Sequence, residues 1–325
     1  MSNRLVFDGL QISNWDRPTL EEVRAGGVHG VHATCAVWEG TLETLRNLSS
    51  WYVLEREHAD IVSIVTSAQG IRAAAEAGQL AVILGFQNAS PFEQDYALVE
   101  VFHRLGVRIA QLTYNIQNHV GGSCYEPHDS GLTRFGHRIV EEMNRVGMLV
   151  DLSHVGERTS LDAVAASSAP VAITHANPRW FADTPRNKSD ELIEAVTERG
   201  GVVGVCFYPN VIGGKDASLE SLCDMVVRLV DQVGIDHVAI GSDAARNWGP
   251  RYVEHLRDGR WKPREPAEWP EWPSWFASPQ DFPRVFEGLS AAGLGDVALA
   301  KIAGENWLRL FETVFANEQS AVAVA

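Results

Sequence analysis

Six polar residues that each follow a short apolar run are the best candidates for chemistry in this sequence. They are Gln87, Tyr114, Asn115, His154, His175 and Asp243. Two imidazoles and a carboxylate that meet at one place form a hydrolytic metal-site pattern, because imidazole suits zinc and similar divalent ions. A single histidine after a strand is more often a hydrogen-bonded structural group. On residue pattern alone, a metal site and a structural role are therefore comparable alternatives for His154 and His175.

The stretch 131–208 indicates how such residues are brought together. Apolar runs alternate there with amphipathic helices: the runs cover 148–152, 169–174 and 201–208, and the predicted helices cover 133–146, 157–167 and 189–199. Short apolar runs between helices are typical of a parallel sheet that is buried on both faces. Chemistry in such a sheet lies at the carboxyl ends of the strands, where His154 and His175 both fall.

The rest of the chain continues this alternation. Strands are predicted near residues 5, 31, 62, 82, 109, 149, 171 and 202, with a ninth near residue 238. Eight parallel strands that alternate with helices close a (β/α)8 barrel, so we expect an α/β, TIM-like fold. No internal repeat or linker divides the chain, and we expect a single domain over residues 1–325.

One segment, residues 246–276, departs from the alternation and is predicted to be an insertion. Besides several prolines it contains five tryptophans, at Trp248, Trp261, Trp269, Trp272 and Trp275. Because proline disfavours helix, we expect a long ordered loop over the barrel mouth or in a subunit contact. Packing is favoured over a substrate lid, since aromatic clusters usually bury area first.

Composition narrows the classes of partner. The net charge of −15 argues against nucleic acid and anionic membranes, because no basic surface is available to offset phosphate repulsion. The cysteines are scattered, with neither metal-binding nor redox spacing, which favours a reducing compartment. The chain enters a strand without a signal sequence, and no apolar stretch reaches the ~18 residues that span a bilayer. We therefore expect a cytoplasmic protein without a membrane partner.

Several segments between Asp8 and Phe311 share one resemblance. They read LTRFGHRIVEEMNRVGMLVDLSHV, APVAITHANPR, TPRNKSDELIEAV, GGVVGVCFYP, HVAIGSD and IAGENWLRLF. Together they resemble the membrane (renal) dipeptidase family of the amidohydrolase-type barrels. The resemblance implies a (β/α)8 barrel of the metal-dependent hydrolase type, a two-zinc centre and hydrolysis of dipeptides, including some with a D-residue at the C-terminal end. It also implies a homodimer.

The resemblance assigns roles to individual residues. His154 and His175 match the two histidines that bind one zinc ion, and Asp243 matches the aspartate that handles the proton during attack on the amide. Arg186 matches an arginine that holds the substrate carboxylate, a task that suits the planar fork of guanidinium donors. Asn115 is the second candidate for substrate binding. Tyr114 stands where the family has an oxyanion-stabilising histidine, and its hydroxyl can still donate a hydrogen bond.

Three metal-ligand positions depart from the family pattern. Leu10 and Ile12 stand where a histidine and an aspartate bind the second zinc ion, and neither side chain can bind metal. Gln87 replaces the glutamate that bridges the two ions, and a neutral amide brings no charge to offset them. One complete metal site is therefore missing, and the sequence predicts a reduced centre made of His154, His175 and Gln87.

These observations leave two functions from different classes. The first is an enzyme that hydrolyses a dipeptide or a similar small carboxylate-bearing amide with one divalent ion, zinc by the resemblance, or with none. The second is a catalytically inactive barrel that binds a small anionic metabolite. The loop 124–129 could supply a replacement metal ligand, because loops at a barrel mouth can reach inward. His32 and His119 could also approach the mouth, although a structural role is the better interpretation of both.

Overall fold

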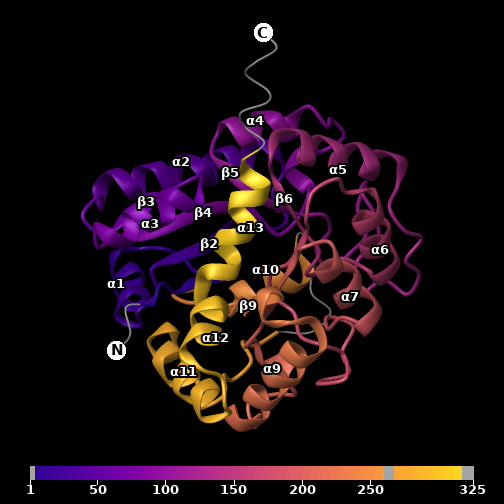
Figure 1. Ribbon diagram of the computed structural model, residues 1–325. Helices are drawn as coiled ribbons and strands as arrows, with labels where there is room; N and C mark the ends of the chain where they lie inside the picture. Colours follow the sequence, from indigo (N-terminus) through magenta and orange to yellow (C-terminus); the bar gives the residue numbers. More distant parts are fainter. Residues whose placement is uncertain (1–3, 260–266, 317–325) are drawn as a thin grey trace.

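The computed structural model describes residues 4–259 and 267–316, and its centre is a nearly closed parallel barrel surrounded by helices (Figure 1). Neighbouring strands pair in parallel in the order β1 (Phe7–Gln11), β2 (Gly30–Ala36), β4 (Leu80–Phe86), β5 (Val107–Gln111), β6 (Leu149–Asp151), β7 (Ala172–Ile173), β8 (Val202–Val205) and β9 (Val238–Ile240). The predicted (β/α)8 fold is confirmed.

The barrel closes between β1 and the residues that follow β9. The backbone N–H of Ile12 donates to the carbonyl of Ala244 at 2.9 Å, and the N–H of Asp243 donates to the carbonyl of Leu10 at 3.1 Å. Because closure occurs at these residues, Asp243 is held directly beside the end of β1.

One predicted strand lies outside the barrel. β3 (Val62–Ile64) pairs only with the first residues of β4, from Leu80 to Val82, whereas β5 pairs with the last, from Leu84 to Phe86. The other edge of β4 is occupied by β2. β3 therefore fills the part of one edge that β5 leaves open, and the strand near residue 238 becomes the eighth strand of the barrel.

Side chains fill the end of the barrel at which the strands begin. Helix α13 (Asn306–Phe315), yellow in Figure 1, lies across it and packs Trp307 and Phe311 against residues near the strand starts. The indole Nε1 of Trp307 donates to the carbonyl of Ile240 at 2.9 Å. A Cβ atom on Gly9 would come within 2.5 Å of the Trp307 ring, so this close approach requires glycine. Because side chains fill this end, the interior of the barrel can open only at the strand carboxyl ends.

Helices cover the outside of the barrel, and the three predicted in the stretch 131–208 are confirmed. The three are α5 (Arg134–Val146), α6 (Glu157–Ala166) and α7 (Asp190–Glu198). Besides α10 (Tyr252–Asp258) and α13, the other α-helices of the described residues are α1 (Arg17–Ala25), α2 (Thr41–Glu57), α3 (Ala68–Glu76), α4 (Leu98–Arg104), α8 (Pro209–Ile212), α9 (Leu219–Val233), α11 (Phe282–Ala291) and α12 (Asp296–Ala300). The side chains of Thr133 and Ser189 cap α5 and α7 by accepting backbone hydrogen bonds. Within the described residues, no helix combines the length and apolarity required to traverse a membrane.

The segment 246–276 contains a helix, so the expectation of a loop throughout is wrong. Helix α10 (Tyr252–Asp258) forms there because the prolines of the segment stand at position 250 and beyond position 258. Trp248 stacks on Tyr252 with ring centroids 3.5 Å apart, and its indole nitrogen donates to the carbonyl of Ile12 at 2.6 Å. Trp261, one of the five tryptophans for which packing was expected, lies outside the described residues. The helix and Trp248 attach the segment to the mouth of the barrel.

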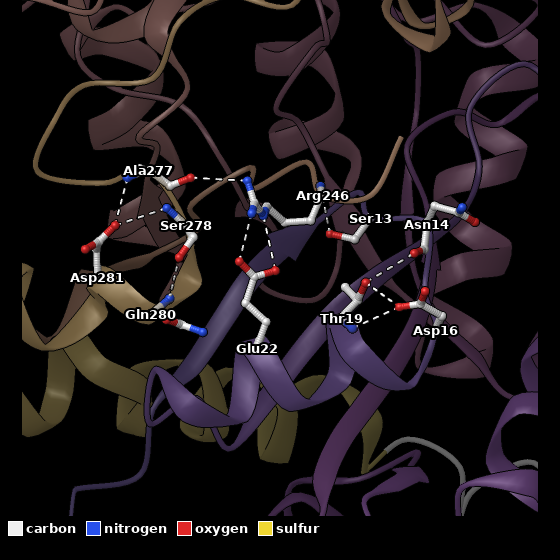
Figure 2. Close-up of polar contacts among 10 residues, drawn as sticks. All are labelled: Ser13, Asn14, Asp16, Thr19, Glu22, Arg246, Ala277, Ser278, Gln280 and Asp281. Atoms are coloured by element: carbon white, nitrogen blue, oxygen red, sulfur yellow. Dashed lines mark hydrogen bonds and ion pairs between the residues drawn. The ribbon is translucent and has the colours of Figure 1, made fainter. Parts of the chain in front are cut away.

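A guanidinium group fixes the start of this segment (Figure 2). Arg246 donates to both carboxylate oxygens of Glu22 on α1, from Nη2 at 2.8 Å and from Nε at 3.2 Å. Its Nη1 donates to the carbonyl of Ala277 at 3.3 Å, and its backbone N–H donates to Ser13 Oγ at 3.2 Å. Three parts of the chain that are distant in sequence are thereby joined beside the barrel mouth.

Candidate active site

A cavity of about 370 Å³ lies at the carboxyl ends of the strands. Nearly all of the predicted site residues line it, namely Gln87, Tyr114, Asn115, His154, Arg186 and Asp243. His175 lies beneath this surface and is completely buried. The structure thus brings together the residues that the sequence placed after separate strands.

His154 and His175 point their imidazole Nε2 atoms at each other. They follow the adjacent strands β6 and β7, and the two Nε2 atoms are 3.1 Å apart. Burial, with a further contribution from the nearby Arg186 guanidinium, lowers the pKa of both imidazoles well below the ordinary value. Both rings are therefore neutral near pH 7.

The hydrogen-bond network fixes the tautomer of each ring. Asn115 donates from Nδ2 to the carbonyl of Leu256 at 3.4 Å, which turns its Oδ1 toward His154 Nδ1 at 2.8 Å. The hydroxyl of Thr174 donates to Asp151 at 2.8 Å, so it accepts from His175 Nδ1, also at 2.8 Å. Both Nδ1 atoms therefore carry the proton, and two Nε2 lone pairs face one point. This donor set suits a single divalent cation.

Asp151, the last residue of β6, holds both histidine-bearing loops. Its Oδ1 accepts from Ser153 N, Ser153 Oγ and Thr174 N at 3.1, 2.6 and 2.9 Å. Ser153 Oγ in turn accepts from the backbone N–H of His175 at 3.0 Å. The sequence prediction did not assign a role to Asp151. Its signal was a carboxylate at the end of an otherwise apolar strand, three residues before a histidine.

Asp243 lines the cavity with a strained backbone and a perturbed carboxyl group. Its φ of 58° lies in the left-handed region, which non-glycine residues rarely adopt. Burial raises the pKa of Asp243 to about 7, against an opposing effect of Arg186. Below it, burial raises the pKa of Asp8 to about 6, although Ser242 donates to that carboxylate from its backbone and hydroxyl at 2.7 and 2.5 Å. A carboxyl group that titrates near neutral pH suits proton transfer.

Arg186 and Tyr114 both interact with His154. The Arg186 guanidinium donates to the backbone carbonyl of Ser153 and, at 2.8 Å, to that of His175. These bonds use two of its five N–H donors, and the group also faces the cavity. The Tyr114 ring stacks on His154 with centroids 4.2 Å apart. Burial raises the pKa of the Tyr114 hydroxyl well above its ordinary value, so the hydroxyl remains a hydrogen-bond donor.

Two of the three positions where the family has the other metal ligands hold apolar residues, and the third holds Gln87. Leu10 is fully buried, and Ile12 packs in a cluster with Val37, Tyr114 and Leu256. Gln87 uses its amide nitrogen to donate to Thr34 Oγ1 at 2.9 Å, which leaves its oxygen as the only metal-binding atom of this side chain. In the described part of the chain, no three His, Cys, Asp or Glu residues are grouped so as to hold a metal ion. The metal-binding atoms that face each other here are therefore the two imidazole nitrogens of His154 and His175.

The loop 124–129 contributes an aromatic side chain and not a metal ligand. Tyr125 lines the cavity, but Asp129 is turned toward α6, where it accepts from Thr159 N at 3.0 Å and Thr159 Oγ1 at 2.5 Å. The sequence prediction missed Tyr125, Tyr208 and Arg257, which line the same cavity. Arg257 belongs to α10, and the sequence held no signal for its position because no helix was expected there.

The other two histidines considered in the sequence are His32, which interacts electrostatically with His175, and His119. His32 is completely buried and directs Nδ1 to the carbonyl of Gly9 at 2.9 Å. His119 contacts Gln94 at 3.3 Å on the exposed side of the loop. Neither residue lines the cavity, and among the described residues the buried Nε2 atom of His32 has no hydrogen-bond partner. A structural role for both stays a prediction.

Comparisons with known proteins agree with this geometry. The chain is 38% identical to an amidohydrolase from Pseudomonas aeruginosa, with a TM-score of 0.92 over 97% of both chains. It shares the fold, at 21% identity and a TM-score of 0.81 over 96% of this chain and 100% of the other, with a metallo peptidase from Rhodobacter sphaeroides that was solved with a phosphinate mimic of the dipeptide L-Ala-D-Ala.

A curated relative gives the same indication over part of its length. Dipeptidase verJ from Clonostachys rogersoniana is 28% identical over 249 residues, which are 72% of this chain and 64% of that protein. The matched region thus spans less than two thirds of verJ. The sequence model of the membrane dipeptidase family, peptidase family M19, matches residues 12–258. This chain therefore belongs to the membrane dipeptidase family.

Proposed function

We propose that this protein is a metallohydrolase that cleaves the amide bond of a dipeptide or a similar small carboxylate-bearing amide at a centre with one divalent ion, zinc first. The observation that carries the proposal is the pair of unprotonated Nε2 atoms of His154 and His175, which face each other beside a cavity lined by Asp243 and Arg186. An ion held by these nitrogens, with Gln87 as the candidate amide-oxygen ligand, would act as a Lewis acid toward the scissile carbonyl.

The residues of the chain supply the remaining functions. Arg186 binds the substrate carboxylate through its free N–H donors and so orients the amide bond. Asp243, with a pKa of about 7, takes the proton of the attacking water and returns it to the leaving nitrogen. Tyr114 donates a hydrogen bond to the oxyanion. Asn115 uses its Oδ1 on His154 and its Nδ2 on the Leu256 carbonyl, so it positions an imidazole, and its contact with substrate stays a prediction.

The alternative function is a catalytically inactive barrel that binds a small anionic metabolite at Arg186. The apolar replacements Leu10 and Ile12 favour it, because they remove the second metal site that the family uses. Both functions place an anion at Arg186, so anion binding cannot discriminate between them. Metal content and turnover can discriminate between the hydrolase and the inactive barrel.

The decisive experiment combines elemental analysis of the protein, purified without chelators, with hydrolysis assays on dipeptides and N-acyl amino acids. We expect about one ion per chain, lost in a His154→Ala, His175→Ala double variant together with all turnover. His137→Ala, on the exposed face of α5, serves as the matched control and should keep both. A protein that binds no divalent ion and hydrolyses none of these amides would overturn the proposal in favour of the inactive barrel.

A further inference from the structure

Part of the cavity lining is a group of apolar side chains. Its side chains are Ile12, Trp38, Val253, Leu256 and Trp269, and we call them the apolar wall. Ile12 and Leu256 belong to one packed cluster with Tyr114, against which Trp38 and Trp269 also pack. Tyr114 in turn stacks on His154. The apolar wall therefore begins beside the imidazole pair and extends to α10 and the segment that follows it.

Charge in the cavity is the reverse of charge in the protein as a whole. The chain carries a net charge of −15, yet two guanidinium groups, those of Arg186 and Arg257, line the cavity. Among residues 4–259 and 267–316, Asp243 is the only carboxylate that lines it, and this side chain interacts electrostatically with Arg186. Arg257 is exposed, and its guanidinium hydrogen-bonds the side chain of Tyr208, which also lines the cavity. The described walls offer no uncommitted negative charge.

A free α-ammonium group is poorly matched to this environment. Two neighbouring cations repel it, and an apolar surface removes its water without providing a hydrogen-bond acceptor. An alkyl or aryl group is instead stabilised by the same surface, because its burial removes apolar area from water. A volume of about 370 Å³ is sufficient for one small ligand.

We infer that the substrate is an N-acyl amino acid whose apolar acyl group lies on the apolar wall and whose carboxylate lies at Arg186, rather than a dipeptide with a free amino group. This inference rests on the proposed function and narrows its substrate class. In the reaction, water adds to the acyl carbon and the C–N bond breaks. The nitrogen takes up a proton and leaves as the amino group of the amino acid, and the acyl group leaves as a carboxylate.

A matched substrate pair tests the inference directly. Leucyl-alanine and 4-methylpentanoyl-alanine have the same skeleton and differ only by the α-amino group, and each is assayed with L- and D-alanine. We expect kcat/KM for the acyl compound to exceed that for the dipeptide by about 10–100-fold, which corresponds to one or two factors of 1.4 kcal/mol. Equal rates, or a faster dipeptide, would overturn the inference while leaving the proposed hydrolase intact.

Variants of the apolar wall provide the second arm. Ile12→Asp adds a carboxylate and should shift the preference toward leucyl-alanine by at least tenfold, whereas Ile12→Ala removes similar volume without charge and should not. Leu256→Ala should lower kcat/KM for 4-methylpentanoyl-alanine about tenfold and leave that for acetyl-alanine within threefold. If Leu256→Ala lowers kcat/KM equally for 4-methylpentanoyl-alanine and acetyl-alanine, the apolar wall does not bind the acyl group.

Binding separates failure of the inference from failure of the proposed function. If neither compound is hydrolysed, isothermal titration calorimetry with the same pair still reports the preference of the cavity. Tighter binding of 4-methylpentanoyl-alanine would support the inference for an inactive barrel, and equal or weaker binding would reject it. The substrate pair also serves if Ile12→Asp does not fold.

Discussion

The two sides of the barrel mouth differ in how their side chains are stabilised. At the ends of β6 and β7, His154 and His175 belong to a buried polar network in which each Nδ1 has an acceptor. At the end of β1, Leu10 is fully buried and Ile12 packs among apolar and aromatic side chains, several of them from the segment that carries α10. A site that had simply lost its function would be expected to lose polar partners on both sides. One side has instead kept a complete network while the other has become a packed surface.

Energetics explain why the change on the β1 side involves several residues. A carboxylate at position 12 without an ion beside it would be buried against Tyr114 and Leu256, and burying an uncompensated charge costs several kcal/mol. An apolar residue there removes that cost but also removes the ion. Leu10, Ile12 and Gln87 are therefore best understood as one coupled replacement, which the apolar surface of α10 completes.

Asp243→Asn should have the largest effect, because it removes the proposed base. We expect kcat to fall by about 10²–10⁴-fold. In the unchanged protein, kcat/KM should rise with pH up to about 7, since the ionised form accepts the proton and burial raises the pKa of Asp243 to about 7. A flat pH profile between pH 5 and 8 would remove Asp243 from this role.

The same variant should stabilise the protein at high pH. Asp243 has a folded-state pKa of about 7, above its value of 3.8 in the unfolded chain, so the native state is penalised progressively as pH rises from about 4 to 7. Asparagine lacks this penalty, and we expect a gain of about 1–3 kcal/mol in the free energy of unfolding at pH 8. The gain should vanish near pH 4, as measured by denaturant unfolding at both pH values.

Introducing the family's metal ligands at Leu10, Ile12 and Gln87 would test the difference between the two sides of the barrel mouth on the apolar side. A Leu10→His, Ile12→Asp, Gln87→Glu triple variant should lose about 3 kcal/mol of stability without metal, because its new carboxylates are buried and unpaired. Added zinc should recover that loss and raise the stoichiometry from one ion to two. Gln87→Glu alone is the matched control and should keep one ion. A triple variant indifferent to zinc would show that the packing of α10, and not ligand identity, prevents a second ion.

Asn115 offers a smaller test on the polar side. Asn115→Ala removes the acceptor that fixes the His154 tautomer, and loss of such a partner typically costs 10–100-fold in metal affinity. Asn115→Asp keeps an acceptor and tolerates the backbone φ of 56°, so its affinity should stay within a few-fold of the unchanged protein. Competition with a chelator measures both. If both variants lower thermal stability without changing affinity, the role of Asn115 is structural only.

The sequence predicts a feature of this fold or site well when the feature depends on neighbouring residues, and poorly when it depends on contacts between distant ones. His154, His175 and Asp243 were predictable because each directly follows an apolar run, and parallel strands end on one face. That β3 lies outside the barrel was not predictable, since it depends on which edge of β4 is still open. The facing of the two Nε2 atoms depends on Asn115 and Thr174, whose contacts no spacing reveals.

Arg246 should give the smallest effect, because its carboxylate partner is only partly buried. The guanidinium joins Glu22 on α1 to the segment that carries α10 and part of the apolar wall, and a partly exposed bidentate pair contributes about 1 kcal/mol (Figure 2). Arg246→Lys keeps the charge but loses the fork, so it should show part of the loss seen in Arg246→Ala. Because α10 and its side chains shift when this anchor is removed, KM should rise a few-fold in Arg246→Ala while kcat changes little. A fall in kcat with unchanged KM would place Arg246 with the polar side of the mouth and contradict its attachment to the apolar side.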